Sequence, residues 1–133
     1  MRIKALLALL SLLVAPAIEA QEKAIEKVIS SQIEAFKSDD FDRAFQFASP
    51  EIQNRIRNPS NFEQMVRGSF PMMMQTKEIE FLDEKSSPPM SWHVVRLIGK
   101  NGARHAFAYE MILIGTQWRI NGVYPLGEPD QSA

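Results

Sequence analysis

Three polar residues on neighbouring predicted strands offer the first candidate chemistry. When those strands are paired through their short turns, His93, Glu110 and Asn121 fall in one row on one face. A histidine beside a glutamate can transfer protons as a general acid–base pair. The same cross-strand pair also occurs on solvated and dimeric surfaces, and no further residue in the row supports catalysis. We therefore interpret the row as an alternative polar site and expect no catalytic residue in it.

A second set combines one cation with three aromatic side chains on the opposite face of the same predicted strands. A guanidinium cannot be buried without partners. Arg96 therefore reaches the sheet edge, pairs with a helix acid such as Asp40 or Glu63, or binds an anionic ligand. With aromatic rings around it, the last option describes a concave pocket for a small anionic or aromatic compound. The candidate ligand-binding residues are Trp92, Arg96, Tyr109 and Tyr124.

Metal and nucleotide chemistry have little support in the sequence. There is no cysteine, which removes thiolate nucleophiles, disulfides and the usual structural zinc sites. The methionines at 72–74 are adjacent, so their side chains diverge and suit core filling better than copper binding. The chain has neither a phosphate-binding glycine loop nor a nucleophile-elbow serine. We expect no metal and no cofactor.

The first 20 residues predict a secretory signal peptide. Arg2 and Lys4 precede an apolar run over residues 5–14, and small residues follow up to Ala17 and Ala20. The run is about half the roughly 20 residues that a membrane-spanning helix needs. We expect cleavage after Ala17 or Ala20, no membrane anchor afterwards, and a periplasmic or secreted product.

The remaining chain is long enough for one hydrophobic core. We expect a single α+β domain over residues 21–126 and a frayed tail over 127–133. The formal net charge of the 133-residue chain is −1 at pH 7, with the signs interspersed. Nucleic acids and anionic membranes need a basic patch, so neither is an expected partner.

Helical patterning fills the first half of this domain. Apolar residues from Ile25 to Phe36 recur on one face of a predicted helix over residues 22–37. Ser38-Asp39-Asp40 supplies capping oxygens for a second, shorter apolar face that ends near Ala48, with Asp39 and Asp40 as an N-cap and a first-turn residue. The third helix is predicted to begin at Ser49-Pro50 and to close before Asn58-Pro59. Ser60 and Glu63 then predict a capping box for a fourth helix, which Gly68 terminates.

A period of two in the second half predicts an antiparallel sheet of about four strands. The first lies around Ile79 and Phe81, and the others span residues 92–98, 104–114 and 117–124. We treat Asn101-Gly102 and Gly115-Thr116 as two-residue hairpin turns. The helix-facing side is then Trp92, Val94, Arg96, Ile98, Phe107, Tyr109, Met111, Leu113, Trp118, Ile120 and Tyr124.

The other side of this predicted sheet carries an apolar patch that the helices cannot also cover. Such a patch commonly marks an association surface. We therefore expect a homodimer through the open face of the sheet. The residues of this patch are Val95, Leu97, Ala108, Ile112 and Val123.

Several short segments resemble an uncharacterised proteobacterial family of unknown function. They are Asp39-Asp40, Ala44-Phe45, Phe47-Ala48-Ser49-Pro50 with Ile52, Phe62 with Met65-Val66, Trp118-Arg119-Ile120 and Gly122-Val123. Helices followed by a curved antiparallel sheet are similar to the nuclear transport factor 2-like superfamily. This resemblance implies a cone-shaped α+β fold with a pocket between helices and sheet. It does not imply one activity, because the superfamily includes isomerases, dehydratases, polyketide cyclases and non-catalytic modules.

The resemblance also bears on catalysis. Catalytic members of that superfamily place an acid or a histidine on the concave face of the sheet. The predicted register puts Arg96 and His105 there but no carboxylate. We therefore favour an exported small-ligand-binding or interaction module without catalytic activity. The alternatives are a small pocket enzyme of lyase or isomerase type and a structural partner in an envelope complex.

Overall fold

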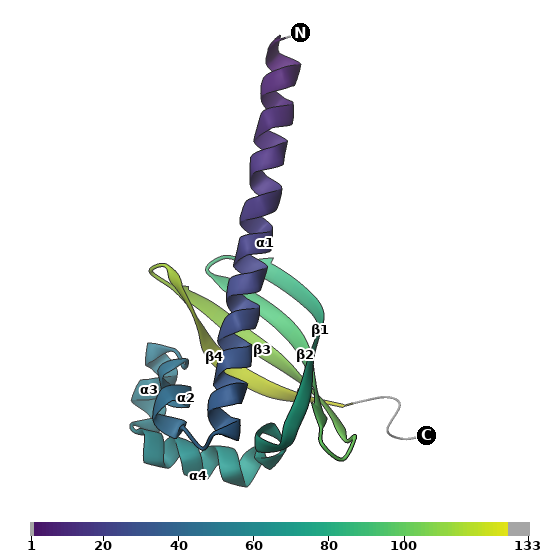
Figure 1. Cartoon of the computed structure of the whole chain (residues 1–133). Helices are drawn as coiled ribbons and strands as arrows, with labels where there is room; N and C mark the ends of the chain where they lie inside the picture. Colours follow the sequence, from purple (N-terminus) through teal and green to yellow (C-terminus); the bar gives the residue numbers. More distant parts are fainter. Residues whose placement is uncertain (1, 128–133) are drawn as a thin grey trace.

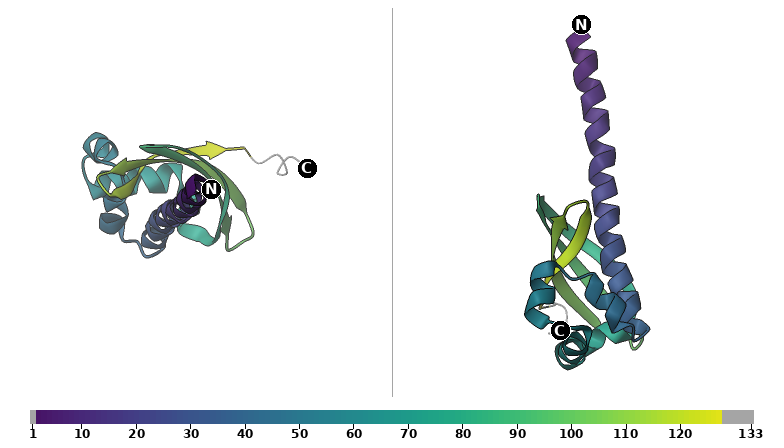
Figure 2. Two further views of the ribbon diagram at one scale, coloured as in Figure 1. Left: turned by 90° about the horizontal axis from the view of Figure 1, so that it is seen from above. Right: turned by 90° about the vertical axis from the view of Figure 1, so that its left-hand side faces the viewer.

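A long helix lies in the hollow of a curved four-stranded sheet (Figure 1; Figure 2, left). The computed structural model describes the backbone of residues 2–127 and the side chains of residues 16–127. The strands follow the order β1-β2-β3-β4, and every neighbouring pair is antiparallel. Helices packed on one face of such a sheet confirm the predicted α+β class.

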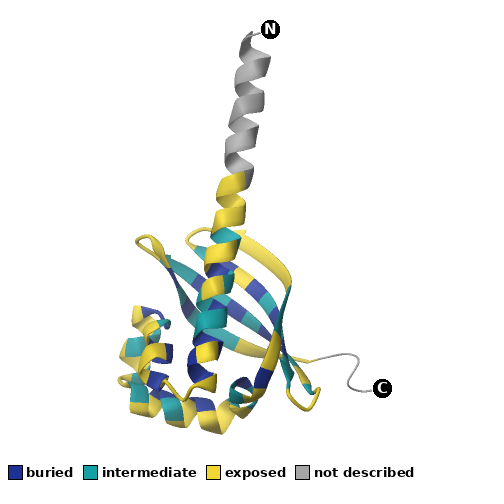
Figure 3. Cartoon of the chain, viewed as in Figure 1, coloured by how far each residue is buried: buried dark blue, intermediate teal, exposed yellow. Residues whose placement is uncertain are grey.

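Helix α1 (Arg2–Lys37) supplies the central part of the core. Ile25, Ile29 and Ile33 are fully buried in the hydrophobic core. Buried and exposed positions alternate along this part of the helix (Figure 3). The helix also continues through the predicted signal peptide, whose alanines and leucines are strong helix formers. Its amino-terminal part extends beyond the sheet (Figure 1).

Three short helices and one 3₁₀ turn follow. They are α2 (Phe41–Gln46), α3 (Pro50–Ile56), α4 (Pro59–Ser69) and η1 (Pro71–Gln75). The predicted caps of the first two are confirmed, because side-chain oxygens of Asp40 and Ser49 accept from Arg43 N and Ile52 N at 3.1 and 3.2 Å.

The predicted boundaries of the fourth helix are wrong. Pro59 occupies the first turn, so the cap is Asn58, whose Oδ1 accepts from Asn61 N at 2.8 Å, and Ser60 is already helical. Gly68 lies inside the helix, which ends one residue later.

The sheet consists of β1 (Thr76–Ser87), β2 (Met90–Gly99), β3 (Arg104–Ile114) and β4 (Gln117–Leu126). Its inner face packs on α1 within one hydrophobic core. Aromatic contacts join the helices to one another in the pairs Phe36–Phe62 and Phe45–Phe62, with ring centroids 5.9 and 5.4 Å apart, and Phe70 after α4 joins them to the sheet through Phe107 at 6.0 Å.

The predicted register between β2 and β3 is wrong by one residue. The loop contains three residues, Lys100 to Gly102, and it closes when Gly99 N donates to Ala103 O at 2.8 Å. Gly102 has a φ of 82°, which suits the left-handed last position of a three-residue hairpin loop. The extra loop residue pairs Leu97 with His105 instead of Ala106.

This slip exchanges the two faces of β2, because side chains alternate along a strand. Ser91, His93, Val95 and Leu97 are buried and point inward. Trp92, Val94, Arg96 and Ile98, which were predicted to face the helices, lie on the outer face. The predicted dimer patch changes as well, since Val95, Leu97 and Val123 belong to the inner face, whereas Ala108 and Ile112 remain outside.

The β3–β4 hairpin follows the prediction only near its turn. Leu113 pairs with Trp118 and Met111 with Ile120 as expected, and Gly115 has a φ of 63°. A register shift then follows, so that Glu110 pairs with Gly122 and not with Asn121 as predicted. The bulge changes the side-chain alternation beyond this point.

The two edges of the sheet differ. At β4, the backbone before α3 acts as an extra partner: Ser49 N donates to Ile120 O, and Ile120 N donates to Phe47 O, both at 2.8 Å. The guanidinium of Arg119 also donates to Gln46 O at 2.7 Å. At β1, the pairing with β2 is interrupted by register shifts at Lys77 and Leu82.

Candidate functional site

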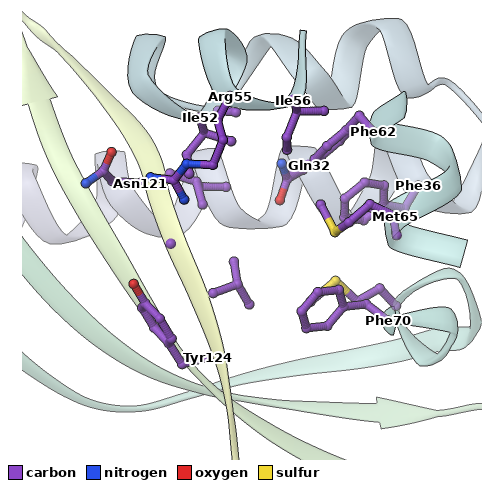
Figure 4. A pocket seen from close by; sticks show the side chains of 16 residues that line it. Gln32, Phe36, Ile52, Arg55, Ile56, Phe62, Met65, Phe70, Asn121 and Tyr124 are labelled. Carbon is purple, nitrogen blue, oxygen red and sulfur yellow. The ribbon is translucent and has the colours of Figure 1, made fainter. Parts of the chain in front are cut away.

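An open cavity of about 350 Å³ lies between the sheet and the short helices (Figure 4). Its walls come from α1, α3 and α4 on one side and from β4 on the other. Most of the lining is aliphatic, aromatic or thioether. The lining residues are Gln32, Phe36, Ala48, Ile52, Arg55, Ile56, Phe62, Met65, Val66, Phe70, Met73, Ile120, Asn121, Gly122, Val123 and Tyr124.

Gln32 is the polar group at the inner end of this cavity. Only 4% of the residue is exposed, and it follows Ile29 and precedes Phe36 on the buried face of α1. Its Nε2 donates to Ala44 O at 3.1 Å. The amide is thereby fixed between α1 and α2.

The mouth of the cavity is polar. Arg55 is exposed and forms an ion pair with Glu51 through Nη2 and Oε1 at 3.0 Å. Tyr124 on β4 also lines the cavity, with its side chain folded over Gly122: a Cβ atom at that glycine would be 2.7 Å from the tyrosine hydroxyl. The lack of a side chain at Gly122 therefore permits the tyrosine to lie there.

A chain of hydrogen bonds holds the mouth together. Ser49 Oγ donates to Asn121 Oδ1, and Asn121 Nδ2 donates to Glu110 Oε2, both at 2.6 Å. The cap of α3 is thus tied through the bulge of β4 to β3. Within the described lining no side chain is an aspartate, a glutamate or a histidine, so the cavity presents apolar surface and neutral or cationic groups.

The structure does not bring the predicted ligand-binding set together. Tyr124 lines the cavity, and its ring contacts Trp92 on the outer face, with centroids 6.0 Å apart. Arg96 is also on the outer face, where Nη1 lies 3.0 Å from Glu80 Oε1 on the adjacent strand. Tyr109 is fully buried in the core, which raises the pKa of its phenol. Its hydroxyl has no hydrogen-bond partner within residues 16–127.

The predicted polar row is also divided. Glu110 and Asn121 are hydrogen-bonded near the cavity mouth, but His93 points to the opposite face of the sheet. The extra residue in the β2–β3 loop shifts the register by one and so exchanges the faces of β2. Sequence reasoning missed Gln32 and Arg55. The sequence did contain an indication of Gln32: a glutamine interrupts the buried apolar face of α1 at a position where an aliphatic residue is expected.

Comparison with known protein families identifies the family of this chain. A family model described as a domain of unknown function (DUF4864) matches residues 18–133, which is most of the sequence. The chain belongs to the DUF4864 family. None of the curated proteins compared with it matches.

The fold of this DUF4864 domain is similar to a solved structure. The crystal structure of an NTF-2-like protein of unknown function from Shewanella oneidensis MR-1 aligns with a TM-score of 0.57 and 17% sequence identity. The alignment covers 79% of this chain and 98% of that one. The predicted resemblance to an uncharacterised family with a nuclear transport factor 2-like fold is therefore confirmed.

Within the described part of the DUF4864 chain, no group of three or more histidine, cysteine, aspartate or glutamate side chains could hold a metal ion. No helix of that part is long and apolar enough to cross a membrane.

A smaller recess of about 230 Å³ lies where α1 crosses the β1–β2 hairpin. Ser91 Oγ lies 3.0 Å from Nε2 of His93, whose exposed fraction is 3%. The Nδ1 atom of His93 lies 3.8 Å from Glu84 Oε2 on β1. Glu22 of α1 and Ser86 of β1 also line the recess. The recess thus combines two hydroxyls, an imidazole and two carboxyl groups.

The carboxyl group of Glu84 in this recess should make the stability of the fold depend on pH. Hydrogen bonding to Glu22, burial, and the charges of Glu22, Glu26 and Asp83 raise the pKa of Glu84 to about 7 from 4.5. The folded protein therefore binds more protons than the unfolded chain between these values, so this contribution to stability falls as pH rises through that window. Burial lowers the pKa of His93, which acts in the opposite sense below its ordinary value of 6.5.

We expect Glu84→Gln to remove the fall in stability between pH 4.5 and 7. Above pH 7 the variant should be more stable by about 1 kcal/mol at most, because Glu84 is 41% exposed and its interactions are screened. Melting temperatures of the wild type and the variant from pH 5 to pH 8 would measure this. Glu78→Gln, outside the recess on the same strand, is the control. Parallel profiles for wild type and Glu84→Gln would contradict the prediction.

Proposed function

We propose that this DUF4864 chain is an exported module that binds a small, largely apolar ligand in the cavity between α4 and β4. The observation that carries the proposal is the composition of that cavity. Its walls are apolar, and a few polar groups are placed at its two ends, as is usual in small-molecule sites. The described lining contains no acid or histidine that could exchange protons with a substrate, which favours binding over catalysis.

Arg55 and the hydroxyl of Tyr124 define the polar end of the proposed ligand. Both lie at the mouth, where a ligand can remain partly hydrated. The guanidinium retains donors beyond the one that meets Glu51, so it can also meet an anionic or polar group. This position replaces Arg96 as the candidate cation.

Export is supported by the amino-terminal segment. The order of charged, apolar and small residues is typical of a signal peptide. The family match begins at residue 18, next to one predicted cleavage site, and the amino-terminal part of α1 extends away from the sheet.

One preparation tests both parts of the proposal. The full-length chain is expressed in a Gram-negative host, and the protein is recovered from the periplasm. Its denatured mass should correspond to a start at residue 18 or 21. Its native mass should show a retained compound that denaturation releases. A product that still begins at Met1 would contradict export, and a ligand-free protein that binds no apolar probe would contradict the binding function.

The smaller recess supports a second candidate, a pocket enzyme of lyase or isomerase type. Burial lowers the pKa of His93, so its imidazole can accept a proton, while the pKa of Glu84 is raised to about 7, so this carboxyl group can donate one near neutral pH. A retained compound that is lost in His93→Gln but kept in a variant with a blocked larger cavity would favour this enzyme. The reverse pattern would favour the binding module.

We also propose a homodimer through the outer face of the sheet. Trp92 and Tyr124 are 39% and 48% exposed there, next to the half-buried Val94, Ala108 and Ile112. A two-fold pairing would bury these side chains. We expect a dimer at micromolar concentration in sedimentation velocity and a monomer for Trp92→Asp. Leu82→Asp at the sheet edge is the control. A monomeric wild type at all concentrations would contradict the proposal.

A further inference from the structure

The orientation of the Gln32 amide has a chemical consequence for the cavity. Its Nε2 meets the backbone carbonyl of Ala44 at 3.1 Å. A carbonyl oxygen only accepts hydrogen bonds, so the nitrogen of the amide must lie on that side and the oxygen on the other. Figure 4 shows the oxygen of Gln32 facing the open centre of the cavity.

This oxygen is an acceptor without a protein partner at the inner wall of the cavity. The residue as a whole is only 4% exposed, and Oε1 has no hydrogen-bond partner within residues 16–127, but it is not among the buried atoms that lack one, so it reaches the surface of the cavity. The surrounding wall offers no alternative donor, because Phe36, Phe62 and Val66 are apolar. A ligand that fills the inner end must therefore donate a hydrogen bond to this oxygen. Otherwise the oxygen loses its contact with water without gaining a partner, and this desolvation weakens binding.

We propose that Gln32 determines specificity by selecting ligands with a neutral hydroxyl or N–H donor at their inner end. The inference rests on the proposed binding function and specifies the class of compound: an apolar body with a phenol, alcohol or amide donor. A carboxylate does not fit at the inner end, because it would bring acceptor against acceptor. An anionic group belongs instead at the mouth, near Arg55.

A pair of probes that differ in the donor tests the proposal. 4-Butylphenol carries a hydroxyl, and 4-butylanisole replaces its hydrogen with a methyl group. Calorimetric titration of the protein should give a measurable dissociation constant for both probes. The phenol should bind roughly tenfold more tightly, as expected for one hydrogen bond against one unpaired buried acceptor.

Substitutions of Gln32 distinguish the contribution of the hydrogen bond to binding from that of the apolar contacts. In Gln32→Leu the preference for the phenol over the ether should fall to about one, because the acceptor is gone. Gln32→Met is the second variant if the leucine protein does not fold. Gln53→Leu is the control: Gln53 also donates to backbone carbonyls, of Phe45 and Ala48, but does not line the cavity.

The outcomes distinguish the inference from the proposed function. A tenfold preference that disappears in the Gln32 variants and persists in Gln53→Leu supports the role of Gln32. Binding of both probes with equal affinity, or a preference that the Gln32 variants retain, overturns it and leaves the binding function standing. Failure of the wild type to bind either probe overturns both.

Discussion

Phe36→Ala is expected to lower the free energy of unfolding by about 3–5 kcal/mol, the usual cost of truncating a buried phenylalanine. The side chain is 2% exposed and lies where α1, α2 and α4 meet. Its ring centroid is 5.7 Å from that of Phe41 and 5.9 Å from that of Phe62. The variant loses this packing and leaves a void that adjoins the larger cavity, so collapse of the neighbours cannot recover the loss.

Urea unfolding at constant pH measures this change, with the slope of the transition checked against the wild type. Small domains have total stabilities of about 5–15 kcal/mol, so the loss is a large part of the whole. Leu82→Ala is the control: Leu82 is exposed on β1, and we expect a cost below about 1 kcal/mol. A loss of similar size at both positions would show that the aromatic contacts of Phe36 do not determine stability.

Met65→Trp is expected to abolish ligand binding while preserving the fold. Met65 lies at the surface of α4 and lines the cavity, so a larger indole can occupy the space of the ligand (Figure 4). We expect at least a hundredfold weaker binding of 4-butylphenol. The melting temperature should be unchanged or higher, because the indole gains apolar burial in space that is already open.

Calorimetry and thermal unfolding of the same preparation provide both measurements. Leu82→Trp introduces the same side chain at an exposed position outside the cavity and should bind the probe as the wild type does. Normal affinity in Met65→Trp would mean that the probe binds elsewhere. The smaller recess around His93 would then be the next candidate for the binding site.

The helical half could largely be predicted from the sequence. Caps such as Asp40 and Ser49 are local signals, and each side chain forms the expected bond. The apolar period of α1 identified its core face as well. The cap of α4 was misplaced because Ser60 and Glu63 imitate a capping box, whereas Pro59 fits the first helical turn one residue earlier.

The strands were predicted, and so was the inner face of β3 with Phe107, Tyr109 and Met111, but the faces of β2 were exchanged. Both faces of β2 mix apolar with polar side chains: Ser91 and His93 occupy one, Arg96 the other. The apolar pattern therefore did not indicate which face of β2 is buried, and the prediction depended on the assumed length of the β2–β3 turn. Asn101-Gly102 suits a two-residue loop, but Gly102 serves as the last residue of a three-residue one.

The candidate site was the least predictable part. Its polar residues come from α1, α3 and β4, and no spacing in the sequence relates Gln32, Arg55 and Tyr124. The bulge at Asn121 also decides what lies at the mouth, and no local residue pattern indicated it. Tertiary packing, rather than a motif, brings these groups together.

The edges of the sheet constrain how copies of this protein can aggregate or assemble. An open edge strand is a template for a further strand, and continued addition produces fibres. The edge of β4 is covered around Ile120 by residues 46–49, and the irregular, charge-rich edge of β1 offers no flat row of backbone groups. Both features disfavour growth by edge-to-edge polymerisation. The proposed contact through a face of the sheet would instead close after two copies and leave the protein dispersed.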